Sequence, residues 1–376
     1  MREIRMVDLY GQYLRIKPEV DKAIQGVIDS TAFIRGADAR QFEDELSAYM
    51  NVAHTIACGN GTDALQVAMM ALGLQPGDEV ITTPFTFIAT VEVIRLLGLK
   101  PVFVDVREDT FNLDPDLLEQ VVTDRTRAIV PVHLFGQCAH MERIMDFARS
   151  HGLYVIEDNA QAIGADYLFQ DGTAKKAGTI GHMGTTSFFP SKNLGAFGDG
   201  GAMFTNDESF GPQLRSLVNH GMKQRYYYDQ VGVKARLDTL QAAILRIKLQ
   251  HLESYHTARQ QVADWYDGTL APLDQLQVPV RSDFSTHIFH QYTLRVKAEI
   301  RDDLRGWLQE KKIPSMIYYP VPLHLQRAYR DLGYEMGDLP VSEQLSSKVL
   351  SLPMHTEMDE AQLEYITEQI HAFFKS

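Results

Sequence analysis

A lysine and an aspartate stand out as residues that could do chemistry together. Lys192 lies in a glycine-punctuated loop within the run GTTSFFPSKNLGAFGDGGA, residues 184–202, and Asp158 follows the apolar run LYVI of residues 153–156. An apolar run closed by acidic and small residues is typical of a parallel strand that is buried on both faces. We therefore expect Asp158 at the carboxyl end of a strand, which is the edge where open α/β sheets bind ligands.

Pyridoxal phosphate (PLP) is a cofactor that needs both residue types. Its aldehyde requires an amine for a Schiff base, and its pyridine nitrogen requires an anion to stay protonated and act as an electron sink. A free lysine has a pKa of about 10.4, so an active-site lysine must be held where its neutral or imine form is favoured. A lone loop lysine is usually a solvated charge, but the residues around Lys192 favour a PLP site.

A second motif predicts a site for an anion. In GNGTDALQVAMMALGL, residues 59–74, apolar positions 65, 68, 71 and 72 form one stripe, which predicts a helix that begins near Thr62. The free N–H groups and the dipole of its amino end, roughly half a positive charge, would face a phosphate. Gly61 would allow close approach and Thr62 would add a hydroxyl. The motif is weak alone, because a glycine before a helix is often only a turn.

Strands and helices alternate through the N-terminal part of the chain. Residues 78–106 and 126–158 each show the order strand, helix, strand, which is typical of a parallel sheet with crossover helices. Before them we expect an irregular arm over residues 1–15 and a helix over 18–30 with Pro18 in its first turn. From about Leu252 the pattern changes to a smaller α+β unit. The sequence thus predicts an α/β fold, with an arm and a large PLP-binding domain over residues 1–251 and a small C-terminal domain over 252–376.

Composition narrows the function classes. The chain has 376 residues, of which 45% are hydrophobic and 23% charged, as is ordinary for a globular protein. Its net charge of −13 argues against binding nucleic acid or an anionic membrane, since both require a basic face. Two cysteines cannot make a disulfide framework or a CxxC metal site. No signal-like segment or long apolar run is visible, so we expect a cytoplasmic protein.

Five motifs together resemble the DegT/StrS family of nucleotide-sugar aminotransferases, over nearly the whole chain. They are FFPSKNLGAFGDGGA, EDNAQAIGA, GNGTDALQVAMMALGL, PFTFIAT and RLDTLQAAIL. The resemblance implies PLP-dependent transferase fold type I, similar to aspartate aminotransferase, and a homodimer with its active site at the subunit interface. It also implies L-glutamate as the amino donor and a nucleotide-linked keto sugar as the acceptor, with pyridoxamine phosphate as the intermediate form of the cofactor.

The resemblance implies roles for the residues around the cofactor ring. Lys192 would form the Schiff base and carry protons, and Asp158 would pair with the pyridine nitrogen. Phe87 would stack on the ring, with a core phenylalanine as the alternative. Ala160 would lie against the opposite ring face, and Gln161 would donate a hydrogen bond to the phenolic oxygen.

Further residues are implied at the phosphate. Those of the same subunit are Gly61, Thr62, Asp63 and Ser187, while Asn193 follows the lysine as in most relatives. An asparagine that reaches the partner's cofactor phosphate in relatives is replaced by Lys234, which could make that contact as a point charge.

The substrate residues are less certain from the motifs. Tyr319 and His324 match a family segment, whereas Tyr318 stands in place of a family histidine. Arg35, in the loop FIRGADARQFE, could approach a ligand or could simply be solvated. Arg236 matches an arginine that meets a sugar carboxylate from the partner subunit, a natural bidentate pairing. The alternative for Arg236 is a structural salt bridge at a helix cap.

The motifs look closest to relatives that act on 3-keto sugars, including UDP-2-acetamido-3-keto-glucuronate aminotransferases that serve surface glycan biosynthesis. A dTDP-linked 3-keto-6-deoxyhexose or a 4-keto sugar is the alternative substrate. A sugar dehydratase of the same fold would replace the lysine by histidine or add cysteines for an iron–sulfur cluster. A non-catalytic regulator would tend to lose the lysine or the aspartate, and this chain keeps both.

The histidines do not predict a metal site. His287 and His290 enter a strand-like run, where side chains three residues apart point to opposite faces. His133 and His140 do not have metal-ligand spacing on one helical face. We interpret His133 as a buried histidine with a local partner.

Overall fold

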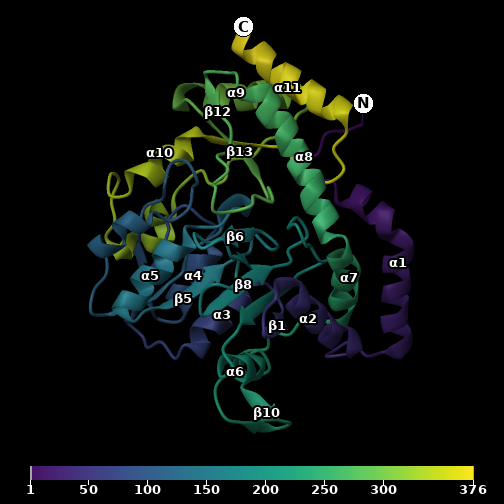
Figure 1. Cartoon of the computed structure of the whole chain (residues 1–376), viewed down its shortest axis with the longest axis vertical. Helices are drawn as coiled ribbons and strands as arrows, with labels where there is room; N and C mark the ends of the chain where they lie inside the picture. The colour runs from purple at the N-terminus through teal and green to yellow at the C-terminus, as the bar shows by residue number, and fades with distance from the viewer. Residues whose placement is uncertain (1, 376) are drawn as a thin grey trace.

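A seven-stranded sheet forms the centre of the protein (Figure 1). The computed structural model describes residues 2–375. The strand order is β1-β9-β8-β5-β4-β2-β3, and every neighbouring pair is parallel except the two pairs made by β9. This confirms the predicted α/β class with a mostly parallel sheet. The strands are β1 (His54–Cys58), β2 (Glu79–Thr82), β3 (Lys100–Phe103), β4 (Thr126–Ile129), β5 (Tyr154–Asp158), β8 (Met183–Ser187) and β9 (Gly201–Thr205).

Helices cover both faces of this sheet, which explains the continuous apolar strands. On β5, Ile156 joins a core shared with α3 (Gly61–Ala71), α4 (Ala89–Leu96) and α6 (Phe210–Leu217). Its neighbour Val155 joins a core on the other face, shared with α5 (Met141–His151). Because successive strand side chains alternate between faces, a strand that meets a core on both faces carries apolar residues at consecutive positions, as Val155 and Ile156 do.

The N-terminal helix is longer than the sequence predicted. Helix α1 runs over Leu9–Ser30, so the expectation of an irregular arm up to residue 15 is wrong for residues 9–15. The Asp8 side chain caps the helix by accepting a hydrogen bond from the Gly11 N–H at 3.0 Å, and Pro18 lies in the interior. Buried Gln12 and Ile16 hold the extra turns against the protein. Both α1 and α2 (Ala37–Met50) pack against α7 (Thr239–Gln250), as Figure 1 shows.

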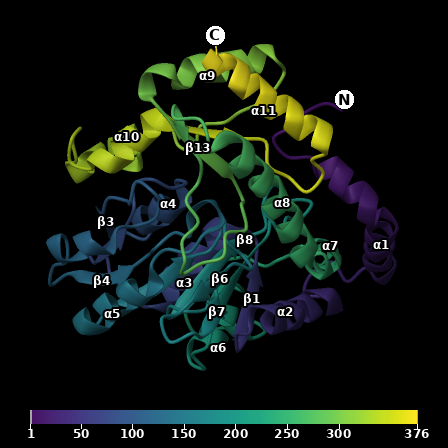
Figure 2. The ribbon, with the colours of Figure 1, turned by 45° about the horizontal axis from the view of Figure 1, so that its top comes forward.

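A second, smaller sheet belongs to the C-terminal part, drawn at the top of Figure 1. Its antiparallel strands are β12 (Leu276–Gln277), β13 (Tyr292–Val296) and β14 (Val349–Leu352). The helices around it are α8 (Leu252–Leu270), α9 (Ala298–Glu310), α10 (Pro340–Lys348) and α11 (Glu360–Lys375), and Figure 2 shows α9 and α11 on its outer side. Helix α8 begins where we placed the domain boundary, and the division into two domains stays a prediction.

Short elements complete the chain. The hairpin of β10 (Met222–Gln224) and β11 (Tyr227–Tyr228) extends away from the body below α6 in Figure 1. A second hairpin joins β6 (Asp166–Leu168) to β7 (Ala174–Lys176), and 3-10 turns cover Pro115–Gln120, Leu134–Gly136, Leu323–Leu325 and Arg327–Leu332. None of the helices within residues 2–375 has both the length and the apolar character that a membrane crossing requires.

Candidate active site

One cavity lies at the carboxyl edge of the central sheet and brings most of the predicted residues together. It has a volume of about 600 Å³ and includes side chains from the N-terminal and C-terminal parts of the chain. Strands β5 and β8 are parallel neighbours, with Asp158 beside Thr185, so the end of β5 meets the loop that follows β8. The predicted residues that line the cavity are Gly61, Thr62, Asp63, Phe87, Asp158, Ala160, Gln161, Ser187, Lys192, Tyr318 and Tyr319.

The Asp158 carboxylate is held in place by hydrogen bonds in the wall of the cavity. Asp158 is only 4% exposed. The Thr90 hydroxyl donates to Oδ2 at 2.7 Å, and the Ala160 N–H donates to Oδ1 at 3.2 Å. A buried carboxylate is costly unless it is hydrogen-bonded or paired, and these two bonds leave it free to face one further cationic partner in the cavity.

Lys192 is the only lysine or arginine among the residues that line this cavity. Burial lowers its pKa to about 8, while the charge of Asp158 acts in the opposite direction. The amine is therefore much closer to neutral at physiological pH than an exposed lysine is. The loop of Lys192 is fixed by a hydrogen bond from the backbone N–H of Lys192 to the Phe189 carbonyl at 2.8 Å.

The amino end of α3 forms another part of the cavity wall. The helix begins at Gly61, one residue before the predicted start, and Asn60 caps it by accepting from the Asp63 N–H at 2.8 Å. A β-carbon on Gly61 would lie 2.7 Å from the Ser187 β-carbon, so only glycine fits against this strand. Burial raises the pKa of Asp63, an effect that the hydrogen bond from Asn60 partly offsets.

Phe87 and Gln161 present their side chains to the cavity in different ways. Phe87 is 57% exposed, which rejects the alternative that it is a core phenylalanine. The Gln161 amide is oriented by the Phe135 N–H, which donates to Oε1 at 2.8 Å. Its Nε2 consequently faces the Tyr319 hydroxyl, to which it donates at 3.1 Å. Burial raises the pKa of Tyr319, so this phenol stays protonated.

Five predicted site residues do not line the cavity. The buried Asn193 amide donates to the Ile288 carbonyl at 3.0 Å, so it ties two loops together, and we do not carry forward its predicted cofactor contact. His324 has a buried ring that bonds to Glu343 at 3.0 Å and packs beside Phe103, so its substrate contact stays a prediction. Arg35, Lys234 and Arg236 lie outside the cavity of their own chain.

Several cavity residues were missed from the sequence. Thr90 lies in the quoted motif PFTFIAT, but a threonine near the start of a helix carries no signal of its contact with a distant aspartate. His290 was considered only as a metal ligand, and Gln291 was not considered. Asp199 adds a carboxylate to the wall. These residues come from segments far apart in the sequence, so only the fold brings them to the site.

His133 confirms the predicted buried histidine with a local partner. Its Nδ1 accepts from the Ala139 N–H at 3.1 Å, which places the proton on Nε2, 2.8 Å from the Glu157 carboxylate. Glu157 also accepts from three backbone N–H groups of the loop before β8, those of Gly178, Ile180 and Gly181. The pair therefore fixes that loop and has no direct part in the cavity.

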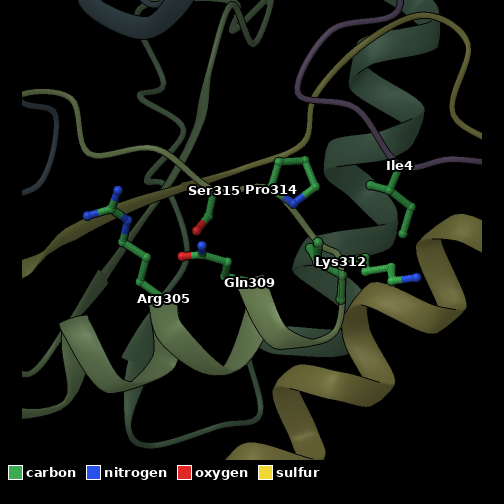
Figure 3. A pocket seen from close by; sticks show the side chains of 7 residues that line it. Ile4, Arg305, Gln309, Lys312, Pro314 and Ser315 are labelled. Carbon is green, nitrogen blue, oxygen red and sulfur yellow. The ribbon is translucent and has the colours of Figure 1, made fainter.

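A different cavity, of about 440 Å³, lies beside α9 and Ile4 (Figure 3). Arg305 and Gln309 project from α9 toward it, and Lys312 follows the helix. The remaining lining residues are Ile313, Pro314 and Ser315. No carboxylate or histidine stands among these lining residues, whereas the Lys192 cavity combines an amine with a buried carboxylate.

The residues around Lys192 fit PLP. The amine, the buried carboxylate, the amino end of α3 and the exposed Phe87 ring are the four kinds of group that the aldehyde, the pyridine nitrogen, the phosphate and the ring face require. Ala160, with its small side chain, lines the same cavity and leaves room for a flat ring. Lys192, Asp158, the start of α3 and Phe87 would therefore hold this cofactor.

The sequence relatives agree with this chemistry. A Geobacillus stearothermophilus protein named pleiotropic regulatory protein is 46% identical over 99% of both chains. A UDP-2-acetamido-2-deoxy-3-oxo-D-glucuronate aminotransferase of Pseudomonas aeruginosa is 43% identical, covering 96% of this chain and 98% of the relative. A dTDP-3-amino-3,4,6-trideoxy-alpha-D-glucose transaminase of Streptomyces venezuelae is 40% identical, covering 96% and 93%.

The solved structures that match share the whole fold. DesV of S. venezuelae has a TM-score of 0.96 and 38% identity, with both chains covered completely. NtdA of Bacillus subtilis, solved with bound PMP, has a TM-score of 0.89 and 30% identity over 96% of this chain and 82% of that one. The family profile matches residues 14–371. The chain is thus a PLP-dependent sugar aminotransferase and belongs to the DegT/DnrJ/EryC1/StrS aminotransferase family.

Proposed function

We propose that this aminotransferase converts UDP-2-acetamido-3-keto-glucuronate to the 3-amino sugar, with L-glutamate as the amino donor. The observation that carries the chemistry is that Lys192 and Asp158 line one cavity, with the amine brought close to neutrality by burial. The 43% identity to the P. aeruginosa enzyme over nearly the full length supports the choice of sugar. The reaction would take place in the cytoplasm, and its product would serve the biosynthesis of a surface glycan.

PLP, when bound, supplies an electron sink for the bond changes at the substrate carbon. The task of Asp158 is to keep an ionised oxygen beside the pyridine nitrogen. Thr90 and the Ala160 N–H support that task, because each stabilises the charged carboxylate by a hydrogen bond. Their bonds also fix the direction in which the carboxylate points.

Lys192 has two tasks at its Nζ atom. The neutral amine is the nucleophile that would attach the cofactor. Once released, the same amine can take a proton from the substrate carbon as a base and donate that proton to another atom as an acid. Both tasks require an amine whose pKa lies near the working pH, and the value of about 8 meets this requirement. The hydrogen bond from the Lys192 N–H to Phe189 keeps the backbone of the loop in place meanwhile.

The other cavity residues position ligands. The start of α3 and Ser187 suit the cofactor phosphate, and Phe87 and Ala160 suit its two faces. The Gln161 Nε2 group donates one N–H to the Tyr319 hydroxyl in the cavity wall, and its second N–H suits the phenolic oxygen. Tyr318 and Tyr319 extend from the C-terminal part and suit the substrate side.

We further propose a homodimer in which Lys234 and Arg236 enter the partner's site. The cavity of one chain contains three carboxylates, those of Asp63, Asp158 and Asp199, and one lysine, so cations from a second copy would balance the charge of phosphate-bearing ligands. Lys234 is exposed and has no ion pair within the described chain. Arg236 has a buried Nε atom that finds no hydrogen-bond partner among residues 2–375.

A dTDP-linked 3-keto sugar is the second candidate substrate. The S. venezuelae transaminase that supports it is 40% identical, only slightly less than the UDP-sugar enzyme. A keto sugar without a carboxylate would leave Arg236 without the bidentate partner that we propose for it. The two candidates therefore predict different consequences of losing that arginine.

A substrate panel tests the proposal. The purified PLP-loaded enzyme is incubated with glutamate and, separately, with the UDP-linked 3-keto-uronate and a dTDP-linked 3-keto-6-deoxyhexose, and the amino sugars are quantified by mass spectrometry. We expect glutamate-dependent amination with the higher kcat/KM for the uronate. Higher kcat/KM for the dTDP sugar would reject the proposed substrate.

Lys192→Ala is the matched control for the chemistry. This variant should lose turnover with every sugar of the panel, together with the visible absorption of the attached cofactor. Transamination retained by the variant would refute the role of Lys192.

A further inference from the structure

His290 is a buried histidine in the wall of the Lys192 cavity that the reaction described above does not use. The residue is 6% exposed and lies just before β13. Its backbone is fixed, because the buried Arg259 guanidinium donates to the carbonyls of Phe289 at 3.0 Å and His290 at 3.3 Å. A β-carbon on Gly136 would lie 2.9 Å from the backbone nitrogen of His290, so the neighbouring backbone is tightly packed as well. The ring is thus built into the wall.

The imidazole has unused hydrogen-bonding capacity. Its Nδ1 atom is buried without a partner, and neither ring nitrogen makes a hydrogen bond to any residue in the described part of the chain. A buried polar group without a partner costs about 1–3 kcal/mol, so such groups in native proteins call for an explanation. Nε2, unlike Nδ1, is not fully enclosed, so a ligand that fills the cavity would supply its missing partner.

The ring is a neutral donor. Burial holds its pKa well below 6.5, and the nearby charges of Lys192 and Arg259 lower that pKa further. A neutral imidazole offers one N–H and one lone pair. This group suits an uncharged oxygen, such as a hydroxyl or a keto group, whereas the two carboxylates of glutamate pair better with cations.

The cofactor does not require His290. Its phosphate, ring faces, pyridine nitrogen and aldehyde already have suitable groups in the start of α3, Phe87, Asp158 and Lys192. His290 and its neighbour Gln291 instead lie with Tyr318 on the wall that the C-terminal part of the chain contributes, and the Gln291 side chain interacts with the Tyr318 hydroxyl.

We propose that His290 is a substrate-contacting residue whose imidazole N–H donates a hydrogen bond to a hydroxyl or keto oxygen of the sugar. The inference rests on the proposed function, because it takes a keto sugar nucleotide as the ligand. It adds a specificity contact that no family motif in the sequence indicated. It also predicts that the amino donor and the cofactor bind independently of this side chain.

The test compares His290→Phe, which keeps a ring without a donor, with His290→Gln, whose amide N–H lies near the position of Nε2. The sugar in every assay is the one that the wild-type enzyme turns over best, so an error in the proposed substrate would be visible in the wild type alone. Affinity of the PLP-loaded enzyme for this sugar, measured by calorimetry without glutamate, provides a readout apart from turnover.

We expect His290→Phe to raise both the KM and the dissociation constant for the sugar by about 5- to 10-fold, the range for one lost hydrogen bond. His290→Gln should recover most of this loss. The rate of the visible spectral change on adding glutamate, and the affinity for PLP, should stay within about 2-fold of the wild type.

His287→Asn is the matched control in the same segment. His287 does not line the Lys192 cavity, and its Nδ1 accepts from the Phe289 N–H at 3.0 Å, a bond that the Asn oxygen can replace. This variant should leave the affinity for the sugar unchanged. Unchanged sugar affinity in His290→Phe, or an equal loss of glutamate or PLP affinity, would overturn the proposal.

Discussion

The Thr90 hydroxyl lies 2.7 Å from Oδ2 of Asp158, across the interface between α4 and the end of β5. Both residues are buried, at 1% and 4% exposure. The bond therefore joins a helix on one face of the sheet to the carboxylate that we propose for the pyridine nitrogen. Because the donor is a side chain and the acceptor is charged, this contact can be tested by removing one hydroxyl.

Thr90→Val should weaken cofactor binding and turnover. Valine keeps the shape of threonine but cannot donate, and a hydrogen bond to a charged group contributes about 1.5–3 kcal/mol, equivalent to about 10- to 100-fold. Titration of the cofactor-free enzyme with PLP, followed by absorbance, measures the affinity. Thr90→Ser, which retains a hydroxyl, is the control, and equal PLP affinity in the two variants would contradict the role of this bond.

The Lys192 amine should titrate near pH 8 in the cofactor-free enzyme. Its labelling by a brief pulse of acetic anhydride, quantified by peptide mass spectrometry, should rise with pH and reach half of its maximum near that value. The reason is that burial disfavours the charged form. Exposed Lys22 serves as the internal reference for the reagent. A Lys192 profile that coincides with the Lys22 profile would contradict the burial effect.

Asp158→Asn should move the Lys192 midpoint to lower pH. The Asp158 charge raises the pKa of the lysine, so its removal leaves the lowering effect of burial unopposed. The same pulse labelling measures this shift. A midpoint that rises in the variant would show that Asp158 does not act on Lys192 through its charge.

Gly61→Ala should damage the cofactor site. The new β-carbon would lie 2.7 Å from the Ser187 β-carbon, so the start of α3 or the end of β8 must move. We expect a loss of about 1–3 kcal/mol in the free energy of unfolding and a weaker affinity for PLP. Chemical denaturation and PLP titration measure the two effects.

Gly26→Ala is the control for that substitution. Gly26 lies inside α1 with nothing within 4 Å of the added carbon. Alanine is the better helix former, so this change should stabilise the protein by about 0.5–1 kcal/mol and leave PLP affinity unaltered. Similar destabilisation by both changes would show that crowding at Ser187 is not the cause.

Arg236→Ala separates the two roles considered for this arginine. If it binds the sugar carboxylate, kcat/KM for the UDP-linked uronate should fall by about 10- to 100-fold, while the value for a dTDP-linked 6-deoxy sugar stays close to that of the wild type. The panel of sugars provides both measurements. Equal losses with both sugars would indicate a structural contact at the start of α7.

Asn193 and α1 show where prediction from the sequence stopped. Asn193 directly follows Lys192, so its neighbourhood in the sequence suggested a cofactor contact, but the loop turns its amide toward the Ile288 carbonyl. The predicted start of α1 was too late in the sequence, because proline is favoured in the first turn of a helix and Pro18 was placed there. The Asp8 side chain instead caps the helix at its observed start. In both cases a local preference was outweighed by contacts with the surrounding structure.

The sequence alone determined the alternation of buried strands and helices, the position of Asp158 at the end of β5 and the start of α3 beside Gly61. Each of these features depends on neighbouring residues and their periodicity. Only the tertiary structure decided that Thr90 supports Asp158 and that His290 enters the Lys192 cavity while His324 does not. These facts depend on packing between segments distant in the chain. No local pattern encodes which buried side chain faces the cavity and which faces the core.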